Sequence, residues 1–311
     1  MSSNNITFIL HKPQLSENIG ACARGIKNFN FHKLTIINPK PIFPNDKILA
    51  TSVGAKNIIN KSKLFDNLEP ALKNIDYVIH CASMTNAEKS FGKENLMYKN
   101  NLDCLKTVIK FCKKNKAKLI HLSSTSVYGK QTELVDEDCE KKYLKPQSPY
   151  ADIKLIEERM LKKNSKHLKY NTFRFGTISG VSKGIRFHTA VNKFCLNAAI
   201  NENIYVYKTA INQYRPYLSI KDAFKTFKFC IENEFFNNDI YNILSGNFTV
   251  GQILKKIRKY KKDIKIKLVK TAIMNQLSYH VSKKKIENEG IILKHDIEND
   301  IKDTLRLLGN I

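Results

Sequence analysis

The sequence predicts an α/β protein with a doubly wound, mostly parallel sheet and a smaller C-terminal subdomain. Two observations support this prediction. Short apolar runs of strand type alternate with longer amphipathic segments of helical period, as in chains of βαβ units. The apolar runs are continuous, which is typical of strands that helices cover on both faces. After about residue 180 the alternation loosens, which predicts a smaller substrate-side subdomain.

The first elements are expected to be a strand at 6–10, a helix at 16–29 and a strand at 33–38. Ser16 is the expected N-cap of that helix. Residues at helical spacing predict its buried face, namely Ile19, Ala23, Ile26 and Phe29.

The later elements continue the same alternation. Strands are expected at 76–83, 117–124, 170–175 and 239–246, and helices at 101–114, 148–163, 221–233 and 249–260. The helix at 148–163 has the clearest start, because Ser148 can cap it and Pro149 suits its first position.

The chain is strongly basic, with 53 Lys and Arg against 28 Asp and Glu and a net charge of +25. Such a charge suits a nucleic-acid or phosphate partner. The lysine runs lie far apart, however, with few interleaved aromatic residues, unlike a platform that stacks bases. A compositional bias over solvated faces is the favoured interpretation, and anionic substrates remain compatible with it.

The seven cysteines are scattered, and none forms a C-x-x-C pair. This favours reduced, mostly buried thiols in the cytoplasm and no metal site. No targeting segment and no apolar run long enough for a membrane span is found, so no membrane partner is expected.

Two segments combine into a candidate catalytic site. "HLSSTSVYG" (121–129) ends a strand with hydroxyls, and "YADIK" (150–154) places Tyr150 and Lys154 on one helix face. An ammonium beside a phenol lowers its pKa, which would make Tyr150 a proton-transfer group near neutral pH. A serine hydroxyl from the strand end could hydrogen-bond a substrate oxygen. A half-buried core tyrosine and a solvated lysine are the alternative.

Together with "DYVIHCAS" (76–83), these segments resemble the extended short-chain dehydrogenase/reductase family, the NAD-dependent sugar-nucleotide epimerases and dehydratases, from about residue 70 to 311. The resemblance implies a Rossmann-like fold and hydride transfer to or from NAD or NADP. It implies that Ser124, Tyr150 and Lys154 are catalytic, and that the cofactor is bound by Ala82, Ser83, Asn101 and Lys154. It also implies a homodimer through helices 93–114 and 148–163.

"YRPYLSIKDAF" resembles a further family segment, in which Arg215 would face a substrate phosphate. Cys104, Ser219 and Lys221 depart from the family's usual residues. His80 and His121 lie inside apolar strands and are expected to be core histidines rather than ligands. For Arg174 and Asp222, a structural ion pair is the alternative to a functional role.

The first quarter of the chain lacks the glycine fingerprint of a dinucleotide site. Its turn reads "HKPQLSENIGACARG", where Gly20 and Gly25 fall within the expected helix. Glu17 would place a negative charge where a pyrophosphate should bind. No acid that could bind a ribose follows the second strand.

Residues 5–79 instead resemble the N-terminal part of SpoU-type RNA 2′-O-methyltransferases of the SPOUT superfamily. "NIGACAR" carries that family's Asn-x-Gly-Ala-x-x-Arg motif, so the resemblance assigns RNA-binding roles to Asn18 and Arg24. The later motifs that bind S-adenosylmethionine are not found. Neither that cofactor nor methyl transfer is therefore expected.

The sequence thus predicts a methyltransferase-like segment at 1–75, a Rossmann-like core at 76–180 and a substrate subdomain at 181–311. The favoured function is a sugar-nucleotide epimerase/dehydratase-type oxidoreductase whose glycine fingerprint is replaced. An RNA-binding protein and a catalytically silent fusion are the alternatives.

Overall fold

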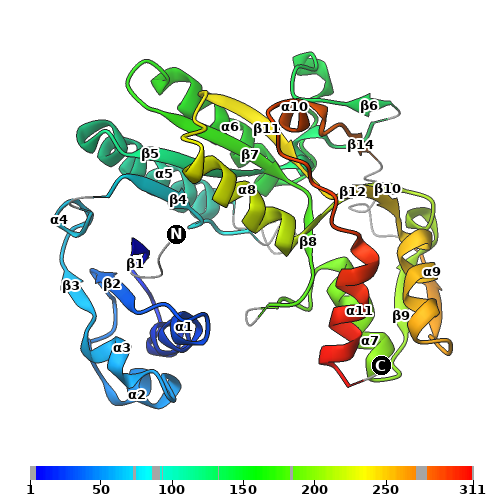
Figure 1. The fold of residues 1–311 in the computed structure, drawn as a ribbon, viewed down its shortest axis with the longest axis horizontal. Coiled ribbons are helices and arrows are strands. Elements are labelled where there is room, and N and C mark those ends of the chain that lie inside the picture. Colours follow the sequence, from blue (N-terminus) through cyan, green and yellow to red (C-terminus); the bar gives the residue numbers. More distant parts are fainter. Residues whose placement is uncertain are drawn as a thin grey trace. The chain divides into compact units, whose positions relative to one another are not determined.

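The protein is described by a computed structural model that covers residues 5–72, 75–85, 92, 94–131, 133–182, 185–270 and 279–309 (Figure 1). It divides into two compact units, an N-terminal unit (Met1–Ile75) and a C-terminal unit (Asp76–Ile311). Both are α/β, and all but one of the strand pairings in the described residues are parallel, so the predicted fold class is confirmed.

The N-terminal unit contains a parallel sheet in the order β1-β2-β3. Its strands are β1 (Thr7–His11), β2 (Lys33–Ile37) and β3 (Lys63–Phe65), and its helices are α1 (Ser16–Asn28), α2 (Asp46–Thr51), α3 (Lys56–Asn60) and α4 (Leu68–Ala71). The apolar side of α1 joins a core with β2 and the short helices. Burial of this apolar surface stabilises the small N-terminal unit.

Two expectations for α1 are wrong. The N-cap is Leu15, which makes no side-chain cap hydrogen bond, while Ser16 is buried and its Oγ accepts from Asn45 Nδ2 at 3.0 Å. Phe29 follows the end of the helix and stays half exposed, although Ile19, Ala23 and Ile26 are buried as predicted. Ser16 therefore links α1 to Asn45, the residue before α2, and does not cap α1.

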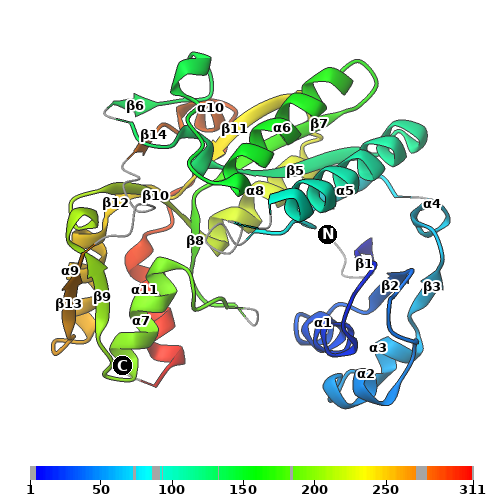
Figure 2. The same ribbon diagram turned by 180° about the vertical axis from the view of Figure 1, so that it is seen from behind.

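The C-terminal unit is built on a parallel sheet in the order β11-β7-β5-β4. The strands are β4 (Tyr77–His80), β5 (Lys118–Ser124), β7 (Tyr170–Phe175) and β11 (Asp239–Ile243). The helices α5 (Glu94–Asn115) and α6 (Pro149–Asn164) cover one face, and α8 (Ile220–Glu232) covers the other, as Figures 1 and 2 show from opposite sides. This is the doubly wound arrangement that the strand and helix order predicts.

Smaller sheets follow the main one. β12 (Gly246–Thr249), β10 (Tyr214–Ser219) and β8 (Thr177–Ser179) form one sheet, β13 (Ile266–Val269) pairs with β9 (Ile204–Tyr207), and β14 (His280–Val281) pairs with β6 (Leu134–Val135). The helices α7 (Ala190–Ala199), α9 (Val250–Tyr260) and α11 (Ile297–Leu307) pack around one core with β9, and α10 (Lys284–Asn288) lies beside β11. Apart from β6 and β8, these elements lie after residue 180, where the alternation of strands and helices is predicted to loosen.

The longest described helix, α5, spans 22 residues and carries charged side chains over its length. Within the part of the chain that the structure describes, no helix is long and apolar enough to cross a bilayer.

Candidate functional site

The carboxyl end of β5 presents Ser124 at the edge of the main sheet. Ser124 is the last residue of the strand and caps the 3₁₀ turn Thr125–Tyr128, because its Oγ accepts from the Ser126 amide at 3.2 Å. The Ser126 hydroxyl also donates to this oxygen at 2.9 Å. Parallel strands commonly present functional groups at this edge of an α/β sheet.

The start of α6 places Tyr150 and Lys154 one turn apart. Ser148 Oγ accepts from the Ala151 amide at 3.2 Å, and Pro149 is the first helical residue, as predicted. The Lys154 ammonium lies 5.7 Å from the centre of the Tyr150 ring. The Ser124 side chain lies close enough to Tyr150 to affect its pKa. The structure therefore brings the three predicted catalytic residues together.

The ionisation of Tyr150 differs from the expectation. Burial and the nearby Glu157 charge raise the pKa of Tyr150 to about 12, while the hydrogen bond to Ser124 acts in the opposite direction. The prediction that Lys154 lowers this pKa is wrong for this arrangement. The reasons are the burial of Tyr150 first and the Glu157 charge second. The Lys154 ammonium donates to Glu157 Oε2 at 2.7 Å.

The loop after β4 contains Ala82 and Ser83. Asn101 of α5 holds this loop by two hydrogen bonds. Its Oδ1 accepts from the Met84 amide at 2.8 Å, and its Nδ2 donates to the Met84 carbonyl at 3.3 Å. Ala82 is exposed. The Ser83 hydroxyl is buried and has no partner within the described residues, so it is a hydroxyl that a ligand could engage.

Arg215 lies in β10, which belongs to a different sheet from Ser124. Its Nε is buried and lacks a partner among the described residues. Its charge lowers the pKa of Tyr279, and so does the hydroxyl of Thr125, the neighbour of Ser124. The guanidinium is thus a donor group close to the serine turn, with the bidentate geometry that suits phosphate.

The turn from β1 to α1 does not fit the pyrophosphate of a dinucleotide. It has no glycine, Pro13 lacks a backbone N–H, and Glu17 puts its carboxylate in the first turn of the helix. Gly20 serves packing between helices, because a Cβ there would lie 2.5 Å from the Ile48 carbonyl oxygen of α2. In the C-terminal unit, by contrast, the Ser83 hydroxyl and Lys154 fit the nicotinamide-ribose end that the motifs imply.

Asn18 and Arg24, the residues of the RNA alternative, are both exposed on α1. They are six residues apart, which places them on different sides of the helix. Their geometry alone does not define an RNA site.

His80 and His121 are buried, and their rings stack at 6.3 Å between centroids. No group of His, Cys, Asp and Glu that could hold a metal ion occurs among the residues described. Arg174 and Asp222 have structural partners, although not each other: Arg174 pairs with Glu158, and Asp222 accepts from Ser245 Oγ at 2.6 Å. These outcomes agree with the structural interpretation of these residues.

Sequence reasoning missed Glu157, which is buried between Lys154 and His121. It stands in "IEERM" beside Glu158 and Arg159, a run that looks like a solvated helix face. The one available signal is its spacing of three residues from Lys154, which places both on one side of α6.

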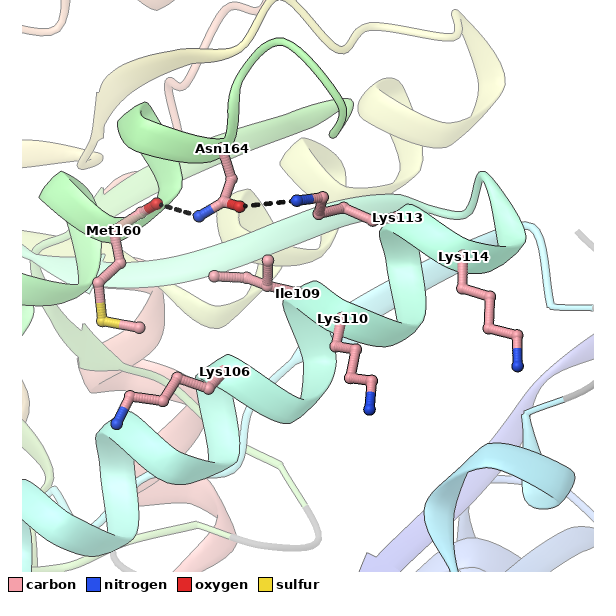
Figure 3. Close-up of a pocket in the computed structure, with 7 residues that line it drawn as sticks. All are labelled: Lys106, Ile109, Lys110, Lys113, Lys114, Met160 and Asn164. Atoms are coloured by element: carbon pink, nitrogen blue, oxygen red, sulfur yellow. Dashed lines mark hydrogen bonds between the residues drawn. The ribbon is translucent and has the colours of Figure 1, made fainter.

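The groove between α5 and α6 lies elsewhere on the C-terminal unit. Its residues are Lys106, Ile109, Lys110, Lys113, Lys114, Met160 and Asn164. Figure 3 shows the amino groups of Lys106, Lys110 and Lys114 projecting from one side of α5, while Lys113 turns toward Asn164, whose Oδ1 accepts at 3.2 Å. None of the predicted catalytic residues lines this groove.

The doubly wound parallel sheet, with serine, tyrosine and lysine at its edge, places the chain in the class of Rossmann-like α/β proteins. Within that class, the sequence profile of the NAD dependent epimerase/dehydratase family matches residues 34–243, and the chain belongs to this family. The match begins in β2, so it includes part of the N-terminal unit.

Relatives of two kinds are similar to this chain. ADP-L-glycero-D-manno-heptose-6-epimerase of Brachyspira hyodysenteriae is 26% identical over 223 residues, which are 65% of this chain and 69% of that protein. The tRNA (cytidine-2'-O-)-methyltransferase TrmJ of Methanocaldococcus jannaschii is 28% identical over 88 residues, which are 28% of this chain and 38% of the methyltransferase. The chain thus spans well under half the length of this second relative.

Among solved structures, the UDP-glucuronic acid 4-epimerase of Bacillus cereus, in complex with UDP-glucuronic acid and NAD, superimposes with a TM-score of 0.72 at 18% identity. The superposition covers 98% of this chain and 99% of the epimerase. At this level of identity the likeness confirms the Rossmann-like fold.

Proposed function

We propose that this protein is an NAD-dependent epimerase/dehydratase-type oxidoreductase that acts on a sugar nucleotide. The observation that carries the proposal is the grouping of Ser124, Tyr150 and Lys154 at one sheet edge, with Ser124 close enough to affect the pKa of Tyr150 and the Lys154 ammonium 5.7 Å from the centre of the Tyr150 ring. Family membership supports it, as do the sugar-nucleotide enzymes among the relatives.

In this proposal Tyr150 holds or gives up a proton at the substrate oxygen, and the Ser124 hydroxyl orients that oxygen by a hydrogen bond. A nicotinamide, when bound, supplies hydride transfer. The raised pKa keeps Tyr150 protonated at neutral pH, so the phenol is ready to donate a proton to an oxyanion. To accept a proton, Tyr150 must first be ionised to the phenolate. This requires a change in the surroundings of Lys154 that lowers the Tyr150 pKa.

Arg215 is the proposed anchor for the substrate. Its unpartnered buried Nε suits the diphosphate of a sugar nucleotide, because a charge-assisted hydrogen bond there would satisfy a group that is now without a partner. The UDP-sugar bound to the Bacillus cereus neighbour supports this substrate class.

In this proposal the C-terminal unit holds the cofactor, with Ala82, Ser83, Asn101 and Lys154 at the nicotinamide-ribose end. Since the β1–α1 turn lacks glycine and carries Glu17, it does not supply the pyrophosphate cradle of a glycine fingerprint. We therefore expect weak dinucleotide binding. NAD is favoured over NADP because NAD occupies the solved neighbours.

The experiment is a turnover screen of the full chain with NAD or NADP and a panel of UDP-, ADP- and dTDP-sugars, with products separated by chromatography. The expected result is epimerised or dehydrated product that Tyr150→Phe abolishes. Asp103→Asn, on the exposed side of α5, is the matched control and should retain turnover. Product formation that survives Tyr150→Phe would overturn the assignment.

A second candidate function is RNA binding, which the similarity to the TrmJ methyltransferase favours. Methyl transfer is not proposed. The exposed Arg24 would contact phosphate, so tRNA affinity should fall steeply with salt, and Arg24→Ala should weaken it. Unchanged affinity in Arg24→Ala would remove this candidate.

We also propose a cytoplasmic homodimer formed through α5 and α6. All seven cysteines are free, which suits a reducing compartment. Lysines on the exposed side of α5 would face their copies across a twofold axis, so salt should strengthen the dimer by screening their repulsion. Sedimentation velocity at low and high salt tests this, and a monomer at both would contradict it.

A further inference from the structure

A buried charged cluster lies beside Tyr150, and the proposed mechanism leaves part of it unused. Lys154, Glu157 and His121 are 3%, 0% and 0% exposed. Lys154 Nζ donates to Glu157 Oε2 at 2.7 Å, and His121 Nε2 lies 3.0 Å from the same oxygen. A carboxylate placed so deeply is costly unless it is paired, so this arrangement calls for an explanation.

Both partners use one oxygen of Glu157. The other oxygen, Oε1, is buried without a partner in the described residues, as is Nδ1 of His121. Burial raises the pKa of Glu157, but the hydrogen bond from His121 and the Lys154 charge outweigh this and leave it below its ordinary value. Glu157 is therefore a carboxylate at neutral pH.

This carboxylate determines where the Lys154 ammonium is held. The ammonium lies 5.7 Å from the centre of the Tyr150 ring and is bonded to Glu157, on the same helix. A cation stabilises a phenolate most when it faces the oxygen without a competing anion. In the observed arrangement the Glu157 charge raises the pKa of Tyr150.

Among the described residues, the other titratable groups around Lys154 and Glu157 supply no cation. They are His80 of β4, Cys81 after β4, Cys104 of α5, His121 of β5, and Glu158 of α6. Burial lowers the pKa of both histidines and raises that of both thiols, so these four groups are neutral. Arg186 is a cation whose charge lowers the pKa of Tyr150.

We propose that Glu157 is a positioning residue that holds the Lys154 ammonium in an ion pair and thereby controls the ionisation of Tyr150. His121 makes this control reversible, because it still satisfies Glu157 when the ammonium turns to the phenol. The proposal rests on the proposed function, since it concerns the tyrosine on which that function depends.

The test is a titration of Tyr150 that needs neither cofactor nor turnover. The full chain is labelled with ¹³Cζ-tyrosine, the Tyr150 resonance is assigned by its loss in Tyr150→Phe, and its pKa is followed by NMR. Glu157→Gln is expected to lower the Tyr150 pKa by at least about one unit, which corresponds to 1.4 kcal/mol. An unchanged titration overturns the proposal. Glu158→Gln is the matched control, because this neighbouring buried glutamate pairs with Arg174.

A second pair of variants separates positioning from a direct effect of the Glu157 charge. Lys154→Met is compared with the double variant Lys154→Met with Glu157→Gln, which removes both buried charges and so avoids an unpaired one. If Glu157 acts through Lys154, its removal lowers the Tyr150 pKa much less when Lys154 is already replaced. An equal shift in both backgrounds shows a purely direct effect and overturns the positioning role. Absence of turnover would refute the proposed function and leave this titration unaffected.

Discussion

The guanidinium of Arg174 and the carboxylate of Glu158 form a two-point ion pair inside the C-terminal unit. Arg174 Nε donates to Glu158 Oε1 at 2.9 Å and its terminal nitrogen donates to Oε2 at 2.7 Å. Ser123 Oγ donates to Glu158 at 2.6 Å, and Arg174 also donates to the Tyr128 hydroxyl at 2.8 Å. The pair therefore fastens α6, which carries Tyr150 and Lys154, to β7 and to β5, which carries Ser124.

Glu158→Ala is expected to lower the free energy of unfolding by roughly 3–5 kcal/mol, because it leaves a buried guanidinium without its counter-ion. Urea denaturation followed by circular dichroism measures this loss. The exposed pair of Lys106 with Asp103 is the control, and Lys106→Ala should cost less than about 1 kcal/mol. Equal effects of the two variants would contradict the structural role of the buried pair.

The two glycines of α1 should respond oppositely to a methyl group. A Cβ on Gly20 would lie 2.5 Å from the Ile48 carbonyl oxygen, whereas a Cβ on Gly25 would meet nothing within 4 Å. Gly20→Ala should destabilise by about 1–3 kcal/mol through overpacking, and Gly25→Ala should stabilise the helix by about 0.5–1 kcal/mol. Chemical denaturation of both variants measures these changes in the free energy of unfolding. If Gly20→Ala left the stability unchanged, the packing role of Gly20 would be refuted.

Acid should destabilise the protein through His80. Burial, together with the nearby His121 and Lys154, lowers the pKa of His80 to about 3. Below its unfolded pKa of about 6.5, the unfolded state binds a proton that the folded state refuses, so stability is lost as the pH falls toward 3. The loss is at most about 1.4 kcal/mol per pH unit for this group. Urea midpoints between pH 7 and pH 5 measure it.

His80→Gln should flatten that pH dependence. His32 is exposed, and its replacement by Gln is the matched control. The same slope in the parent protein and in His80→Gln would mean that His80 does not carry the effect.

Arg215→Ala should weaken substrate binding more than it slows turnover. The loss of a charge-assisted hydrogen bond of about 1.5–3 kcal/mol predicts a KM, or a Kd for UDP, raised by about 10- to 150-fold. Calorimetry with UDP, and kinetics with the substrate that the screen identifies, measure the two effects. Binding that is unaffected by Arg215→Ala would exclude the proposed anchor.

The order of strands and helices could be predicted because burial on both faces leaves continuous apolar runs, and the start of α6 because Ser148 and Pro149 act locally. The prediction that Ser16 caps α1 is wrong, because a serine at the start of a helix can instead hydrogen-bond a neighbouring element, here Asn45. Capping preferences are local, and this contact joins residues far apart in the sequence.

In the candidate site, too, local features could be predicted and contacts between distant residues could not. Periodicity places Tyr150 and Lys154 on one side of α6, and the structure brings Ser124 to them. The direction of the Lys154 ammonium could not be predicted, because it depends on Glu157 and His121, which meet across two elements. Two adjacent glutamates in an amphipathic helix give no sign that both are buried.

The proposed function requires that this chain bind a nicotinamide dinucleotide without a glycine fingerprint. We would therefore titrate the full chain with NADH and with NADPH, followed by nicotinamide fluorescence, with S-adenosylmethionine calorimetry alongside. We expect saturable NADH binding that NAD competes away, and no heat with S-adenosylmethionine. Absence of saturable binding of either nicotinamide dinucleotide would refute the proposed function.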